Sequence, residues 1–344
     1  MKLTFFGTRG SIPVAGNQYK EFGGNTTCLG IQSECFPEDF GLCIDSGSGF
    51  IPASKKALQN KKLKEFNVLH THWHHDHTQG MTMSALTFNK SVKMNVWGPV
   101  EGDYGPREII KHLMKPPFFP IDFARVGSHF EFFTIENPDT KIIAIHKTGG
   151  IVMVTQEVFE RGEGFVSFGK RGTYPVSDCM IVRMRWTNHP ERTISYRFEE
   201  GPTGQVFVFL TDHENQAELS KDMQRHLSDA DLLVMDSQYK TEQYRTFTAG
   251  FGHGTPDYCA GVAIMVGAKM LGLTHHAPDS SDEDVRQIVE DAKAHIKNSM
   301  IDNAHNLAGF EPPKVFACGD YMEIDLSDEP VLSGSVGTET KSRA

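Results

Sequence analysis

HTHWHHDH, from His70 to His77, holds five histidines and one aspartate in eight residues. In an extended segment the side chains alternate, so His72, His74 and Asp76 can project to one side, while a following helix turns His77 toward them. A zinc ion takes three or four protein ligands, and two-metal hydrolytic sites hold their ions roughly 3.5–4 Å apart. The stretch therefore predicts parts of two metal sites, and the remaining ligands must come from elsewhere in the chain.

The pattern around this stretch predicts a mixed α/β protein. Residues 66–72 (FNVLHTH) are typical of a buried strand, and residues 78–88 (TQGMTMSALTF) of the beginning of a helix. Further strands are predicted over 94–99, 141–146, 179–186, 193–199 and 205–212. Further helices are predicted over 54–66, 215–229, 256–270 and 281–300.

Three later segments offer metal ligands at the ends of predicted strands. TNHP contains His189, FLTDHE contains Asp212, and LTHHAP contains His275 and His276. A carboxylate at Asp212 would neutralise part of the charge of two cations by bridging them. The alternative for Asp212 is the N-cap of a helix before ENQAELS, with its neighbour His213 exposed.

HTHWHHDH contains the motif HxHxDH, and the order of the motif, then His, then Asp, then His resembles the metallo-β-lactamase superfamily. The DSGSG segment at residues 45–49 resembles the strand-end turn that precedes the motif in that family. The resemblance covers nearly the whole chain. It implies an α/β fold, an αββα sandwich of two mixed sheets flanked by helices.

The resemblance also implies two divalent metal ions, with a hydroxide between them as the nucleophile, because binding to dications lowers the pKa of water from about 15.7 toward 7. Zinc is the first expectation and manganese the alternative, since imidazole and carboxylate ligands suit several divalent ions. His70 and His75 fall outside the motif, so we expect them to support the ligands or lie at the surface. The implied ligands are His72, His74 and His189 for one ion, Asp76, His77 and His275 for the other, and Asp212 between them.

Two further segments resemble the phosphodiesterase side of the superfamily, the ribonuclease Z-like and PhnP-like enzymes. DLLVMDSQY ends an apolar strand with Asp236, and AGFGHGTPDYCAGVA places His253 in a Gly-rich turn before a helix. The resemblance implies that Asp236 orients His253, which protonates the leaving oxygen; such help contributes about 10²–10⁴-fold. We expect Asp76, besides binding metal, to be a catalytic residue together with His253 and Asp236. The alternative for His253 is a helix-start residue without a chemical role.

The substrate that these features favour is a small phosphodiester such as a cyclic nucleotide. GTRGSIPVAGNQYKEFGGNTTC resembles PhnP-like proteins that include cyclic-nucleotide phosphodiesterases, and within it Arg9 is a candidate phosphate or base contact. Ribonuclease Z carries its tRNA-gripping arm between the ligands that correspond to His189 and Asp212, and here only 23 positions separate them. The formal net charge of −10 also argues against a broad grip on nucleic acid. Ribonuclease Z-like RNA processing, a lactonase or thioesterase, and a metal-binding sensor without turnover are the alternatives.

A chain of 344 residues could hold one large domain or two ordinary ones, and the resemblance implies a single domain over residues 1–326. The Pro-rich and Gly-rich stretches at about 100–175 predict an insertion, and residues 327–344 are expected to form a disordered tail. Six cysteines without a CxxC pair fit reduced thiols, and no membrane-spanning run or signal peptide is apparent, so we expect a cytoplasmic protein. A homodimer is common among relatives and is compatible with this sequence.

Overall fold

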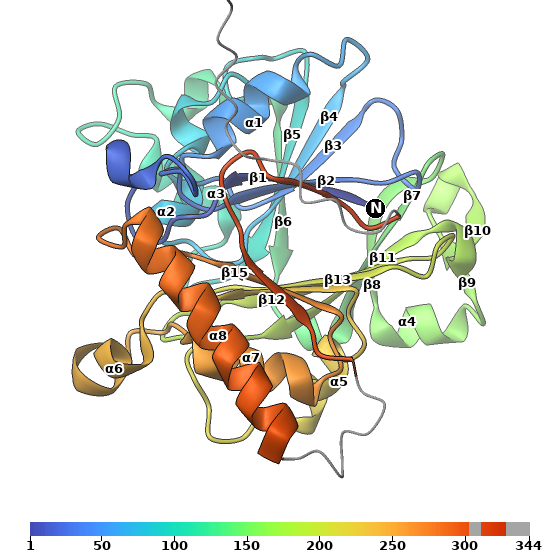
Figure 1. The fold of residues 1–344 in the computed structure, drawn as a ribbon. Coiled ribbons are helices and arrows are strands. Elements are labelled where there is room, and N and C mark those ends of the chain that lie inside the picture. The colour runs from blue at the N-terminus through green and yellow to red at the C-terminus, as the bar shows by residue number, and fades with distance from the viewer. Residues whose placement is uncertain (303–310, 328–344) are drawn as a thin grey trace, which may run out of the picture.

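Two mixed β-sheets pack face to face, and helices cover both outer faces (Figure 1). The structure is a computed structural model in which residues 1–302 and 311–327 are described. The α/β sandwich of two mixed sheets flanked by helices is therefore confirmed.

The first sheet has seven strands, of which β3, β4, β5 and β6 run parallel. In spatial order they are β17 (Glu323–Asp325), β1 (Lys2–Gly7), β2 (Cys28–Gln32), β3 (Phe40–Ile44), β4 (Glu65–Leu69), β5 (Lys93–Pro99) and β6 (Phe130–Ile135).

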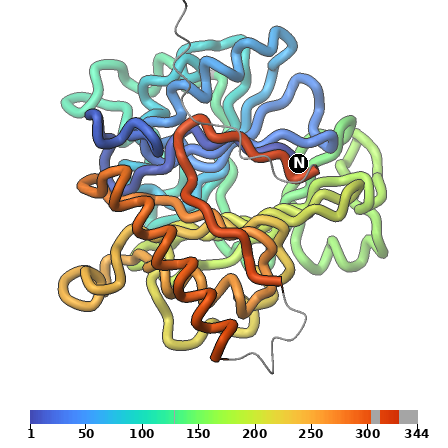
Figure 2. The backbone as a smooth tube through the Cα atoms, in the orientation of Figure 1, coloured from blue at the N-terminus to red at the C-terminus, as the bar shows by residue number. Residues whose placement is uncertain are grey.

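The second sheet has eight strands, of which β13, β14, β15 and β16 run parallel. In spatial order they are β16 (Lys314–Ala317), β15 (Met270–Thr274), β14 (Leu232–Asp236), β13 (Val206–Leu210), β12 (Ile194–Glu200), β11 (Met180–Trp186), β7 (Lys141–His146) and β8 (Gly150–Thr155). A separate hairpin pairs β9 (Phe165–Ser167) with β10 (Thr173–Pro175). Figure 2 shows the red end of the chain passing from the second sheet to the first, because β16 and β17 belong to different sheets.

The helices pack on the outer faces of the sheets or lie at their edges. They are α1 (Phe50–Ala57), α2 (His75–Thr78), α3 (Pro106–Leu113), α4 (Gln156–Arg161), α5 (Lys221–Leu227), α6 (Thr241–Gln243), α7 (Pro256–Met265) and α8 (Asp282–Asp302). In the described part of the chain, every helix is too short or too polar to cross a membrane.

The alternation of side chains along β13 explains why this layer arrangement forms. Phe207 and Phe209 point into the core between the sheets, whereas Val208 and Leu210 pack beneath the helices of the second sheet. A strand that is apolar on both faces is stable only when both faces are covered. Burial of large apolar side chains contributes roughly 1.5–3 kcal/mol each, so the sandwich gains stability from both faces.

Three predicted helices are shorter than expected. The predicted helix 256–270 ends at Met265, because residue 270 already begins β15. Of the predicted helix 78–88, only Thr78, the last helical residue of α2, and a separate 3-10 turn at Met81–Met83 are helical. The reason is Gly80, where a Cβ would lie 2.0 Å from the carbonyl oxygen of Gly47, so the chain docks on the 45–49 turn instead of continuing the helix. The predicted helix 215–229 is reduced to α5, because Ser220 caps it by accepting from the amide of Met223.

The predicted helix 54–66 also differs, since α1 begins at Phe50, ends at Ala57, and residues 65–66 already belong to β4. The segment 100–175 is more regular than expected, because β6 joins the first sheet and β7 and β8 join the second. Whether this segment is an insertion stays a prediction. The expected tail lies outside the described residues from position 328 onward.

Candidate metal centre

The candidate ligands gather where parallel strands of both sheets end. In the second sheet β13 and β15 run parallel with β14 between them, and Asp212 and His275 follow these strands within two residues. In the first sheet the HTHWHHDH stretch directly follows β4. Ligands of open α/β sheets bind outside the carboxyl ends of the strands, so this edge is the expected place for a site.

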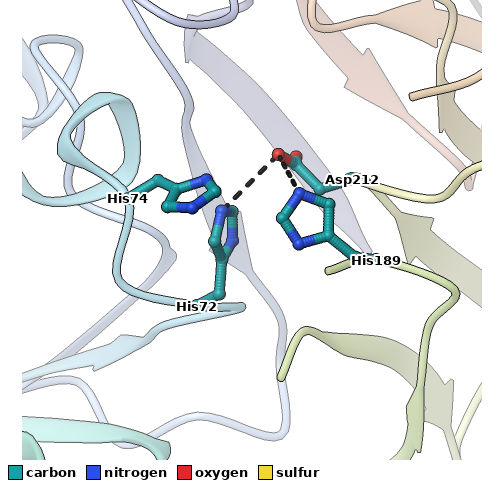
Figure 3. Close-up of side chains that lie close together, drawn as sticks. All are labelled: His72, His74, His189 and Asp212. Carbon is teal, nitrogen blue, oxygen red and sulfur yellow. Dashed lines mark ion pairs between the residues drawn. The ribbon is translucent and has the colours of Figure 1, made fainter. Parts of the chain in front are cut away.

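The first group of ligand atoms comes from three separate segments. His72 and His74 belong to the loop after β4, His189 lies between β11 and β12, and Asp212 follows β13 (Figure 3). One donor atom from each lies within 4.8 Å of the others. The Asp212 Oδ2 atom is 3.5 Å from His72 Nε2 and 3.8 Å from His189 Nε2.

The second group consists of Asp76, His77 and His275. The Nε2 atom of His275 is 3.1 Å from Asp76 Oδ2, and the Nε2 atom of His77 is 3.4 Å from the same oxygen. Asp76 and His77 lie in α2, while His275 follows a strand of the opposite sheet. Residues about two hundred positions apart therefore form one cluster.

Asp212 lies between the two groups and presents one carboxylate oxygen to each. Its Oδ2 faces His72 and His189, whereas its Oδ1 is 3.4 Å from both His77 Nε2 and His275 Nε2. Asp212 and His275 both have positive φ angles, of 54° and 61°. Such backbone strain in residues other than glycine is concentrated at functional sites.

Several buried polar atoms at the first group have no hydrogen-bond partner among the described residues. They are His72 Nε2, His189 Nε2 and Asp212 Oδ2. Leaving a buried polar atom unpaired costs roughly 1–3 kcal/mol, and such atoms are rare unless an ion or water satisfies them. Imidazole and carboxylate are ligands that divalent zinc, manganese and related ions accept. The residues therefore fit a divalent metal centre.

The electrostatics of the cluster depend on close opposite charges. Burial by itself would raise the pKa of Asp212, but the neighbouring imidazoles of His275, His77 and His72 hold it well below the usual range. Burial, together with the charge of His77, lowers the pKa of His72. Burial lowers the pKa of His77, but the carboxylates of Asp212 and Asp76 outweigh it and raise that pKa, so the ring holds a proton in the absence of an ion. Metal binding requires ionised carboxylates and neutral imidazoles, and an ion bound here would displace that proton.

A second set of contacts orients the ligand imidazoles. His77 Nδ1 is 2.8 Å from Asp45 Oδ2, and Asp45 also accepts from the backbone and hydroxyl of Thr71. His74 Nε2 is 3.2 Å from a Glu191 carboxylate oxygen, which leaves its Nδ1 for the site. Such partners fix the ring orientation and raise ligand basicity. The sequence prediction included Asp45 only as part of a turn and missed Glu191, because these contacts join residues far apart in the chain.

His253 lies beside the cluster, as its place in the Gly-rich turn predicted. Its Nδ1 is 2.9 Å from Asp236 Oδ2, and its ring stacks on His275 with centroids 4.9 Å apart. Burial lowers the pKa of His253, but the hydrogen bond to Asp236 and the charge of Asp212 outweigh it and raise the pKa. Burial raises the pKa of the Asp236 carboxyl. The pair therefore retains a proton strongly.

The histidines outside the motif have other partners. His70 is buried, pairs with the Ser46 hydroxyl at 2.8 Å and stacks on Trp73. His276 pairs with the carbonyl oxygen of Cys318 at 2.9 Å. His75 is exposed. The structure thus places these three away from the grouped donor atoms.

Two expectations are wrong. His213, expected to be exposed, is 1% exposed, and its ring accepts from the Asn188 amide and pairs with the Tyr258 hydroxyl at 3.0 Å. Arg9, expected to contact phosphate or base, is completely buried. Its guanidinium donates to three backbone carbonyls, those of Gly23, Ala277 and Ser280, so it holds loops together instead of facing a substrate.

The loop that contains Arg9 reaches the site through its backbone. The amide of Ser11 donates to Asp76 Oδ2 at 2.7 Å, and Gln238 donates to the Ser11 hydroxyl at 3.0 Å. A Cβ at Gly10 would lie 2.4 Å from the His275 ring, so only glycine fits there. The N-terminal loop therefore packs directly against two of the candidate ligands.

Comparison with known proteins agrees with this fold. Ribonuclease Z from Clostridium acetobutylicum is 23% identical over 275 residues, which are 76% of this chain and 85% of that protein. The metallo-beta-lactamase fold protein YhfI from Bacillus subtilis superposes with a TM-score of 0.57 at 16% identity, over 94% of this chain and 98% of that one. A diphosphatase from the PhnP family gives a TM-score of 0.54 at 14% identity, over 96% and 99%.

The family described as the beta-lactamase superfamily domain matches residues 42–276, a span that runs from β3 through the motif, His189 and Asp212 to His275. The chain therefore belongs to the beta-lactamase superfamily.

Proposed function

We propose that the protein is a dinuclear metal-dependent hydrolase that cleaves a phosphodiester bond in a small substrate such as a cyclic nucleotide. The observation that carries this proposal is the position of Asp212. Its two carboxylate oxygens face two different groups of ligands, while His253 and Asp236 lie beside both.

The residues of each group have defined roles in this proposal. His72, His74 and His189 would hold one ion, Asp76, His77 and His275 the other, and Asp212 would contact both. Bound divalent ions at such a site lower the pKa of water and neutralise charge on the phosphate. The amide of Ser11 fixes Asp76 from outside the cluster.

His253 supplies the proton that the leaving oxygen needs. Because Asp236 occupies its Nδ1 at 2.9 Å, the other ring nitrogen is free to donate. His253 also approaches Asp212 and His275 closely enough to form a third candidate ligand group with them. The other two groups already supply three ligands each besides Asp212, so His253 is left for the role of an acid.

The preference for a small substrate rests on the interval between His189 and Asp212. This interval consists of β12, β13 and the short turn between them, all within the second sheet. It therefore lacks, in a fully described part of the chain, a projecting arm to grip RNA. The similarity to ribonuclease Z at 23% identity nevertheless makes RNA processing the second candidate.

Substrate panels separate these functions. Purified protein with measured metal content is assayed against cyclic nucleotides, dinucleotides and bis(p-nitrophenyl) phosphate, and in parallel against precursor tRNA, lactones and thioesters. The proposal predicts turnover of the small phosphodiesters. Turnover of lactones or thioesters alone would contradict it, and cleavage of precursor tRNA alone would favour the second candidate.

Three finer expectations belong to the same proposal. Zinc is the expected metal and manganese the alternative. All six cysteines are buried and unpaired in the described chain, which agrees with a reducing cytoplasm. A single domain over residues 1–326 and a homodimer remain proposals that a sedimentation experiment would test.

A further inference from the structure

The loop between β14 and α7 carries His253 and needs an anchor of its own. It contains α6, a π-helical turn at Tyr244–Thr248, and two glycines, Gly250 and Gly252, with φ angles of 93° and 92°. Figure 1 shows α6 projecting from the rest of the molecule, so this part of the loop has little packing around it. Asp236 fixes the imidazole ring of His253, but the backbone that precedes it must be held by other contacts.

The start of α6 is fastened by Lys240 to Asp284 and by Thr241 to Asp257. In the stretch just before His253, the contacts are made by the carboxylate of Glu214. Its Oε1 accepts from the amide of Gly250 at 3.0 Å, and its Oε2 accepts from the amide of Gly252 at 2.5 Å. The hydroxyl of Tyr244 also donates to Oε1. Hydrogen bonds to an ionised acceptor are roughly twice as strong as neutral ones, so these three donors hold the loop at three positions.

Glu214 is itself fastened to the segment that carries a metal ligand. Its amide donates to the Asn188 carbonyl at 2.7 Å, and the Asn188 side chain donates to the Glu214 carbonyl at 3.3 Å. Asn188 directly precedes His189, and Glu214 follows Asp212 by two positions. The carboxylate therefore connects the loop of His253 to two candidate ligands of the first metal.

The fit between these segments leaves no space for a side chain at Gly252. A Cβ at Gly252 would lie 2.3 Å from Cδ2 of His189, so the loop backbone touches the ligand ring. Misplacement of a reacting group by about 1 Å can cost roughly a hundredfold in rate. A loop released from Glu214 would carry His253 away from the leaving oxygen without disturbing the ligands themselves.

We infer that Glu214 is a positioning residue for His253, and that its carboxylate sets the distance between the proton donor and the metal centre. This inference rests on the proposed function, in which His253 protonates the leaving oxygen. Glu214 acts through the loop, by two backbone amides and the Tyr244 hydroxyl.

The test is the dependence of rate on the leaving group. Wild type and Glu214→Gln are assayed on aryl and alkyl phosphodiesters whose leaving groups span a wide pKa range, with bound metal measured on each sample. Glutamine keeps one acceptor oxygen but turns an NH₂ group toward a loop donor. We expect a loss of roughly tenfold or more in kcat for alkyl leaving groups, and less than about twofold for p-nitrophenolate, which needs little protonation.

The controls separate positioning from a general structural defect. Glu218→Gln makes the same chemical change at an exposed position and is expected to behave as wild type. Adding Glu214→Gln to His253→Ala should cause little further loss, because both changes remove the same proton transfer. Should Glu214→Gln fold poorly, Glu214→Asp keeps the charge, is one methylene too short to hold the loop, and carries the same expectation.

The outcomes distinguish this inference from the proposed function. The dependence of rate on the leaving group could become steeper in His253→Ala but not in the Glu214 variants. That result would overturn the role of Glu214 and leave the role of His253 intact. Equal losses on all leaving groups, or fully additive losses in the double variant, would also overturn it. An unchanged dependence in His253→Ala would contradict the acid role itself, and the inference would fail with it.

Discussion

Replacement of Asp236 by asparagine should impair proton transfer without affecting metal binding. The 2.9 Å contact between its Oδ2 and His253 Nδ1 is buried, and asparagine keeps the volume but loses the charge. A hydrogen bond to a charged group contributes about 1.5–3 kcal/mol, which corresponds to roughly a ten- to hundredfold loss in kcat where protonation limits the rate. We expect this loss for alkyl phosphodiesters and almost none for p-nitrophenyl esters.

Asp45→Asn is the matched control for this prediction. Asp45 Oδ2 lies 2.8 Å from His77 Nδ1, so the same carboxylate-imidazole contact occurs on the metal side of the site. Its loss should weaken metal binding by about 10–100-fold and lower the rates of all substrates together. The assay is steady-state kinetics on both ester classes, with metal content by mass spectrometry. Loss of metal from Asp236→Asn, or equal losses on both ester classes, would refute the assignment.

Three further predictions concern the ligands, the loop and an isolated buried histidine. Asp76→Ala should lose one metal ion per chain and nearly all activity; retention of two ions at full activity would refute its place in the second group. Gly252→Ala should lower both stability and activity, because its φ of 92° and the His189 ring leave no room for a Cβ; an unaltered melting temperature would argue against this contact. Burial and the charges of Arg197, Arg185 and Arg183 lower the pKa of His226 to about 3. The neutral His226 ring therefore stabilises the fold fully above pH 6.5, and this stabilisation is lost as the pH falls toward 3. In urea titrations, the unfolding free energy of His226→Gln should fall less than that of wild type between pH 7 and pH 5.

The sequence was most informative where chemistry is local. His72, His74, Asp76 and His77 are adjacent in the chain, and a strand followed by a helix is enough to direct them to one place. His189, Asp212 and His275 could be predicted because each follows an apolar strand, where a polar residue stands out, and because their order in the chain matches the superfamily.

Residues that act through long-range contacts could not be predicted. Asp45 and Glu191 orient ligands from other segments, and neither stands in a pattern that distinguishes it from a turn or surface carboxylate. The errors at Arg9 and His213 have the same origin. Arg9 is bound by backbone carbonyls, and His213 is bound by Asn188 and Tyr258. These partners meet the two residues only in the folded chain.

The shortened helices show how tertiary contacts override local preference. Gly80 is compatible with a helix in isolation, but its contact with Gly47 ends α2 after one turn. Asp76 and His77 are the two middle residues of the short α2, and both face the cluster. The departure from the predicted helix is thus part of what forms the site.

Phosphorus NMR during metal titration tests the dinuclear phosphodiesterase most directly. Metal-free protein is supplied with increasing equivalents of zinc or manganese, and conversion of a cyclic nucleotide to its phosphomonoester is followed. We predict that the rate rises to a plateau at two equivalents per chain in wild type, and that Asp212→Asn stays far below it. A full rate at one equivalent, or no phosphomonoester from any cyclic or linear dinucleotide with two ions bound, would contradict the proposed function.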